Sequence, residues 1–129
     1  MAEPQDLALA GITKQLRKLM DGSQQAMYIY LDDKRKACNS RMADLLGYPS
    51  AEAWASVRTS FPQAFVQEES QDTLVSAYQD AMRHGTGSAI PVVWKRKDGE
   101  PVDTDVVLVP IEHEGQRMAL HFIEPASDD

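Results

Sequence analysis

Apolar and polar residues alternate most regularly over residues 92–110. In the second half of this segment one parity carries Val102, Thr104, Val106 and Leu108, and the other carries Asp103, Asp105, Val107 and Val109. A period of two is typical of a strand with one buried and one exposed face. Asp98-Gly99 interrupts the pattern, and Asp-Gly between apolar runs favours a hairpin with a two-residue turn of the primed type. We therefore predict an antiparallel hairpin here.

A helical period governs residues 5–20. Large apolar residues recur there at spacings of three and four: Leu9, Ile12, Leu16 and Leu19. They form the narrow apolar stripe of an amphipathic helix, and a helix of this length needs a surface to cover. Val93, Val107 and Val109 share the parity that points away from the core of the predicted sheet, where apolar side chains need a cover. We hypothesise that the helix packs on these valines, within its own subunit or across a dimer.

The rest of the chain divides into short elements. We predict strands at 26–31 and 35–38, and then a helix that ends at residue 46, between the N-cap residue Asn39 and the terminating Gly47. Helices follow at 51–55 and 68–83, whereas 56–67 has no clear period. After a turn at 113–116, a last strand covers 117–124. Two strands, a helical insert and a three-strand meander exclude a parallel βαβ sheet and predict an α+β fold with helices on one face.

Composition narrows the possible partners and location. The chain has 129 residues, which suits one domain, and its net charge of −7 disfavours binding to nucleic acid or anionic membranes. Cys38 is the only cysteine, so we expect no internal disulfide. We find no apolar run of membrane-spanning length and no secretory signal, and we expect a cytoplasmic protein. We divide it into an N-terminal amphipathic helix (1–22), a folded domain (23–125) and a disordered tail (126–129).

Three segments resemble the PAS family of sensory domains when taken in order. They are AMYIYLDDKRKACN, NSRMADLLGY and RKDGEPVDTDVVLVPI, and the resemblance covers residues 24–124. It implies a five-stranded antiparallel sheet with the last strand central and helices cupped against one face. The implied function is a sensory or protein-interaction module in signal transduction, dimeric through its leading helix. Its implied partners are a second copy, a downstream signalling domain or protein, and a small molecule.

The resemblance also implies a cavity between the sheet and the helices. By position its lining would come from Met42, Leu46, Trp54, Phe65, Tyr78, Met82, Trp94 and Val106. Such residues also commonly do no more than fill a core, which is the alternative interpretation. His121 is a further candidate if 119, 121 and 123 point inward, and the set 118, 120 and 122 is equally compatible with the pattern.

A haem- or flavin-binding sensor of the same fold is the alternative function. His84 lies near the place where haem-binding relatives carry an axial ligand, but its simpler explanation is a cation at a helix C-terminus. Residues 55–66 lack the cysteine of flavin photosensors, and His113 falls in a predicted turn, where we expect solvent. We find no metal-ligand spacing, phosphate loop or nucleophile motif. We therefore expect no catalysis and no cofactor, with a small cavity enzyme as a remote alternative.

Overall fold

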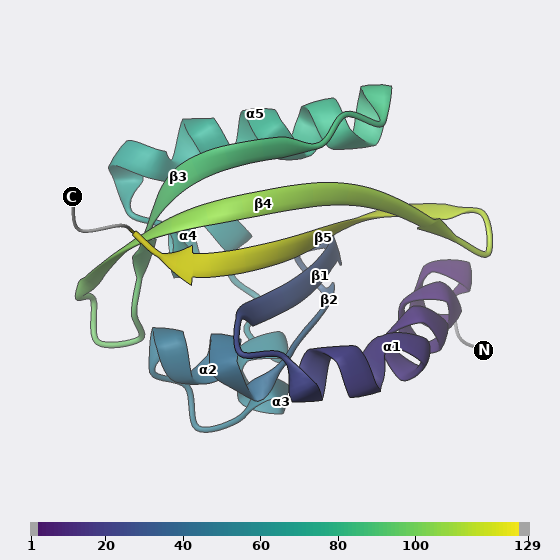
Figure 1. Cartoon of the computed structure of the whole chain (residues 1–129), viewed down its shortest axis with the longest axis horizontal. Helices are drawn as coiled ribbons and strands as arrows, with labels where there is room; N and C mark the ends of the chain where they lie inside the picture. The colour runs from purple at the N-terminus through teal and green to yellow at the C-terminus, as the bar shows by residue number, and fades with distance from the viewer. Residues whose placement is uncertain (1–2, 127–129) are drawn as a thin grey trace.

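The computed structural model describes residues 3–126 and contains one five-stranded antiparallel sheet (Figure 1). The elements in chain order are α1 (Pro4–Gly22), β1 (Ala26–Asp32), β2 (Arg35–Cys38), α2 (Ser40–Leu46), α3 (Ala51–Ala55), α4 (Phe61–Phe65), α5 (Glu68–His84), β3 (Ser88–Lys95), β4 (Pro101–His113) and β5 (Gln116–Pro125). The strand order β2-β1-β5-β4-β3 places the last strand at the centre. The predicted α+β fold is confirmed.

Helix α4 is the element that the sequence pattern did not predict. It is only five residues long, which is too short to show a helical period. Pro62 suggested an irregular segment, but it occupies the first turn of α4. Backbone N–H groups in the first turn have no partner within the helix, so proline is tolerated there. The predicted tail at 126–129 lies, apart from Ala126, outside the described residues.

Asn39 joins three elements at one buried point. Its Oδ1 accepts from Met42 N at 3.0 Å, which caps α2 as predicted, and also from Met27 N of β1 at 3.1 Å. Its Nδ2 donates to Met20 O at the end of α1 (2.9 Å) and to Gln25 O (3.0 Å). All four bonds come from a side chain that is nearly inaccessible to solvent, so Asn39 fixes where α1 ends relative to the sheet.

The two hairpin turns differ in geometry, and the primed turn is not at the place that the sequence suggested. At Asp98-Gly99 the predicted two-residue primed turn is wrong: Gly99 N donates to Arg96 O, and the loop has three residues with only Gly99 at positive φ. The primed turn lies instead between β4 and β5, where Glu114 (φ 51°) and Gly115 (φ 78°) are both left-handed. His113 pairs directly with Gln116 across that turn.

Helix α1 covers the outer face of the sheet over β1, β5 and the hairpin end of β4. The cluster beneath it comprises Ala8, Ile12, Leu16 and Met20 from the helix and Met27, Ile29, Met118 and Leu120 from the strands. This confirms that the helix covers the outer face but corrects the place, because the sequence could not show which strands lie beneath it. Val107 and Val109 are 47% and 36% exposed, Val93 is half-buried outside this cluster, and Leu19 is 54% exposed.

Candidate functional site

The inner face of the sheet carries most of the residues that the sequence proposed for a cavity. Met42, Leu46, Trp54, Phe65, Trp94 and Val106 are all completely buried in one cluster between the sheet and helices α2–α5. These six side chains fill the core and do not line an open space. Tyr78 packs in a smaller neighbouring cluster, and Met82 is half-buried on α5 outside both. The core-filling alternative therefore describes most of the set.

A small cavity remains beside this core, and we call it the inner chamber. Its volume is about 40 Å³, and its principal lining residues are Tyr28, Tyr30, Phe61, Leu74, Tyr78 and His121. Tyr78 and His121 were predicted to line a cavity, whereas the other four were missed. Tyr28 and Tyr30 occupy inward-facing positions of β1, as ordinary core residues do. Their alternation in the sequence therefore does not distinguish cavity-lining residues from core residues.

His121 faces inward because β5 pairs with β1 in a register that places it opposite Tyr28. The two rings stack at a centroid distance of 3.8 Å and an interplanar angle of 10°. The inward set on β5 is therefore Ala119, His121 and Ile123, while Met118 and Leu120 lie under α1. Of the two inward sets that the sequence pattern allowed on this strand, the structure shows the one that contains His121.

The chamber wall contains two buried polar atoms without a protein partner. Tyr28 Oη and His121 Nδ1 make no hydrogen bond with the described residues. Burial lowers the pKa of His121 to about 3, although backbone groups of Ala119 and Tyr28 oppose the shift. Burial also raises the pKa of Tyr28, with a further contribution from Tyr30. Both side chains are thus neutral at pH 7, and each leaves hydrogen-bonding capacity that a bound polar molecule would satisfy.

Two tyrosines at the edge of the chamber are held by hydrogen bonds to the β1–β2 region. The Tyr30 hydroxyl donates to Asp33 Oδ1 at 2.7 Å, and the Tyr78 hydroxyl donates to Leu31 O at 2.6 Å. Their rings meet edge to face at 5.0 Å. Asp33 Oδ1 also accepts from Phe61 N at 2.9 Å, so a single carboxylate positions two of the lining rings. The edge of the chamber is consequently formed by side chains that are anchored at their polar ends.

Lys36 ties the helical layer to the edge of the sheet. Its Nζ donates to Asp33 O at 2.6 Å and to Val57 O at 2.7 Å, and it lies 5.7 Å from the centroid of the Trp54 ring. Burial lowers the pKa of Lys36, although nearby carboxylates, chiefly Asp33, counteract part of this shift. Because both carbonyl acceptors hold the ammonium, Lys36 is a structural clamp and not a free nucleophile.

The remaining candidate groups do not converge on a reactive centre. Within residues 3–126, no group of three or more His, Cys, Asp or Glu side chains is arranged to hold a metal ion. Cys38 is half-buried, and burial raises the pKa of its thiol to about 12, which makes a thiolate scarce at pH 7. His84 is exposed at the end of α5. No helix of the described chain has the length and apolar character needed to cross a membrane.

His113 is not solvated as its place in a turn suggested. Its side chain is only 16% exposed, and the middle of α1, at Gly11, lies against it. A Cβ atom added at Gly11 would lie 2.9 Å from His113 Nε2, so a glycine in α1 permits this close approach. The β4–β5 hairpin is therefore part of the surface on which α1 rests.

Solved structures share this arrangement of sheet and helices. The PAS domain of a protein from Colwellia psychrerythraea superposes with a TM-score of 0.68 at 19% identity, covering 89% of this chain and 97% of that one. The PAS domain of an HTR-like protein from Haloarcula marismortui gives 0.63 at 19%, covering 92% and 94%. Drosophila melanogaster Cycle PAS-B, solved with bound ethylene glycol, gives 0.63 at 10%, covering 78% and 99%.

The sequence matches no protein-family model and no curated protein. The structural likeness spans 78–92% of this chain, and so it identifies the PAS fold. The resemblance seen in the three sequence segments is confirmed at the level of the fold.

Proposed function

We propose that this chain is a sensory and protein-interaction module of signal transduction that acts as a homodimer and carries out no catalysis of its own. The observation that carries the proposal is the inner chamber, which is lined mainly by aromatic rings and whose wall contains the unpartnered Tyr28 Oη and His121 Nδ1. A buried donor or acceptor without a partner is unfavourable by about 1–3 kcal/mol. A small polar molecule that reached these atoms would recover that free energy and stabilise the conformation that holds it.

The chamber's size restricts its occupant. Pockets for drug-sized ligands measure roughly 300–1,000 Å³, and 40 Å³ is far below that range. One water needs about 10–15 Å³ of such space, so two or three waters, or a molecule of a few heavy atoms, would fit. Ethylene glycol, present in the Drosophila structure, is of this kind. Haem and flavin are much larger and would require the tyrosines at the chamber edge to move, so we do not favour the cofactor-binding alternative.

Nuclear magnetic resonance of the histidine side chains tests this occupancy, with ethylene glycol as the probe. We expect a saturable shift of the ¹⁵N resonances of His121. Exposed His84 serves as the internal control and should not shift in the same way. If His121 showed no shift, or if all histidines shifted linearly with concentration, the chamber would not bind small polar molecules.

The exposed part of the outer face supports the homodimer. Val107 and Val109 remain accessible on β4, and exposed Ala89 lies directly opposite Val107 on β3. An uncovered apolar strip beside a packed helix is typical of an interaction surface. A second copy would offer the same strip and bury both in a two-fold contact. We infer that α1 contributes to this interface from its exposed flank, where Leu19 lies.

Sedimentation velocity of a double variant tests the interface. Val107→Asp with Val109→Asp should convert the dimer to a monomer, while the unfolding temperature of the monomer changes little because both positions are exposed. The control, Thr73→Asp with Ser76→Asp, adds the same charge on the exposed side of α5 and should leave the dimer intact. A monomeric wild-type chain, or equal dissociation in both variants, would refute the interface.

We also propose a cytoplasmic location. The lone, half-buried Cys38, whose thiol is inert, is compatible with a reducing compartment. Fractionation of cells expressing the chain from its own gene checks this location directly, and recovery in a secreted or membrane fraction would contradict it.

A further inference from the structure

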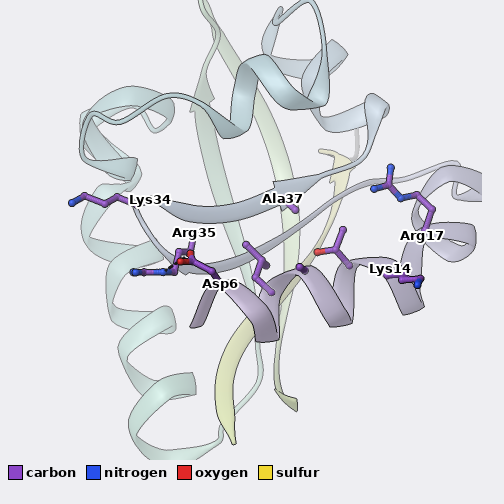
Figure 2. Close-up of a pocket in the computed structure, with 9 residues that line it drawn as sticks. Asp6, Lys14, Arg17, Lys34, Arg35 and Ala37 are labelled. Atoms are coloured by element: carbon purple, nitrogen blue, oxygen red, sulfur yellow. Dashed lines mark hydrogen bonds and ion pairs between the residues drawn. The ribbon is translucent and has the colours of Figure 1, made fainter. Parts of the chain in front are cut away.

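An open groove lies between helix α1 and strand β2, on the side of α1 away from the β4–β5 hairpin (Figure 2). We call it the basic groove. Its volume is about 480 Å³, and its middle is formed by Leu9, Ala10 and Thr13 of α1 and Ala37 of β2. A second hollow of about 180 Å³ shares Thr13, Arg17 and Ala37 with it, continues toward α3 and carries the carboxylates Asp21 and Glu52. The basic groove itself, without this second hollow, has a mainly apolar floor.

Positive charge borders this groove in an otherwise acidic protein. Lys14 and Arg17 lie toward one end, Lys34 and Arg35 lie at the other, and Asp6 is the single carboxylate in the lining (Figure 2). Asp6 Oδ1 is already paired with Arg35 Nε at 2.9 Å. Within residues 3–126, Lys14, Arg17 and Lys34 form no ion pair. Since the whole chain has a net charge of −7, this local excess of unpaired cations selects for an anionic partner.

Thr13 adds an independent indication of an absent partner. Its Oγ1 is buried within the groove and makes no hydrogen bond with the described residues. A threonine in a helix usually satisfies its hydroxyl with the carbonyl four residues earlier. Because that bond is not made, the Thr13 hydroxyl keeps hydrogen-bonding capacity that no described residue satisfies. Its oxygen is inaccessible to solvent, so a group bound in the groove would reach it only after the side chain rotates.

The lining favours a peptide over other anions. It contains no aromatic ring on which a nucleobase could stack and no glycine-rich phosphate loop. An apolar floor between cationic ends matches an amphipathic segment, whose apolar residues face the floor and whose carboxylates reach the rim. From Asp6 to Arg17 the helix extends about 16 Å at 1.5 Å per residue, close to the length of three helical turns of a bound segment.

We propose that the basic groove binds an acidic amphipathic segment of a partner protein. This surface is separate from the exposed valines on β4 and from the inner chamber. The interaction therefore depends neither on the homodimer nor on the chamber's occupant, and its test can fail while both of those proposals stand.

Fluorescence anisotropy with a labelled synthetic peptide tests the proposal. The probe is a helix-forming peptide of about three turns, with leucine along one face and glutamate along the other. We expect saturable binding that weakens as salt is added, because exposed charges are screened. A peptide with lysine in place of glutamate, and one with serine in place of leucine, should each bind at least tenfold more weakly.

Matched charge reversals locate the site. Lys14→Glu with Arg17→Glu should weaken peptide binding at least tenfold. The control, Lys18→Glu with Arg83→Glu, makes the same charge change at exposed residues outside the groove and should weaken binding less than threefold. Circular dichroism and sedimentation should show both variants folded and with the oligomeric state of the wild type.

Three results would overturn the proposal. The first is no wild-type binding at millimolar peptide, and the second is an equal loss of affinity in the control variant. The third is binding of ATP or of phosphatidylserine vesicles by a wild-type protein that does not bind the peptide, since the groove would then recognise phosphate and not an acidic segment.

Discussion

The two faces of the sheet are built from the same strands and differ in how completely they are closed. On β4, Thr104, Val106 and Leu108 point inward and are buried, whereas the alternate residues Val107 and Val109 point outward and are exposed. The inner face is covered by helices α2–α5, and two tyrosines beside them are anchored at their hydroxyl groups. On the outer face, α1 packs on β1, β5 and the hairpin end of β4, and leaves Val107 and Val109 of β4 uncovered. The difference indicates that the inner face sets stability and that the outer face remains available for association.

Among these predictions, loss of a buried aromatic ring on the inner face should lower the free energy of unfolding most. Trp54 is fully buried and stacks on Phe65 at 5.2 Å. Trp54→Ala should lower the free energy of unfolding by about 3–5 kcal/mol, as for other large-to-small core changes. Urea unfolding measures the change. Leu19→Ala, at a position 54% exposed, is the control and should stay within about 0.5 kcal/mol of the wild type; equal effects would mean that the inner face does not dominate stability.

Disrupting the packing of α1 on the outer face should cause the second largest loss of stability. Ile12 and Leu16 pack on the cluster that contains Met27 and Met118. Ile12→Asp with Leu16→Asp should destabilise the chain by about 2–3 kcal/mol, because apolar burial is lost and charges are desolvated. Leu7→Asp, at a 57% exposed position of the same helix, is the control for added charge and should cause little change. Identical urea midpoints for the two variants would show that α1 does not contribute to stability through this cluster.

Acid should weaken the inner face through His121. Its pKa is about 3 in the folded chain against an ordinary value of 6.5, so unfolding takes up a proton below pH 6.5. The unfolded state binds more protons there, and stability therefore falls as pH falls from 6.5 toward 3. Between pH 7 and pH 5 the loss from this residue should be about 2 kcal/mol.

His121→Phe is the variant that isolates this contribution, because phenylalanine keeps a ring against Tyr28 without titrating. The difference in unfolding free energy between wild type and variant should change by that amount over the same pH interval. A difference that does not depend on pH would show that His121 does not stay neutral in the folded chain.

The two hairpin turns should give the smallest effects. Glu114 has a positive φ, so Glu114→Gly should stabilise the chain by about 0.5–1 kcal/mol by removing a strained left-handed residue. Asp98→Gly should not stabilise it, because Asp98 does not have a positive φ and glycine adds chain entropy to the unfolded state. Paired thermal unfolding measures both, and a gain at Asp98 without one at Glu114 would reverse the assignment of the turns.

Local patterns predicted every helix and strand except α4, and pairing between distant strands decided the arrangement of the elements. The alternation on β4 and the cap at Asn39 followed from neighbouring residues, and both were confirmed. The inward orientation of His121 was not predictable, since it depends on its register with Tyr28 on β1. The place where α1 packs also depends on tertiary contacts, among them the bond from Asn39 Nδ2 to Met20 O.

The inner chamber was predictable only in outline. The sequence identified large apolar side chains for the inner layer, but it could not distinguish those that fill the core from those that border a space. That distinction depends on packing gaps of a few atoms, as in the 40 Å³ beside His121. The exposed valines were recognised as outward-facing, but their lack of cover follows from the position of α1 over β1 and β5.

Native mass spectrometry of the freshly purified chain is the most direct test of this division between a closed inner face and an associating outer face. We predict a species of twice the chain mass, shifted to a single-chain mass by Val107→Asp with Val109→Asp, and carrying no ligand as large as haem or flavin. A monomeric wild-type chain, or a retained cofactor of that size, would contradict it.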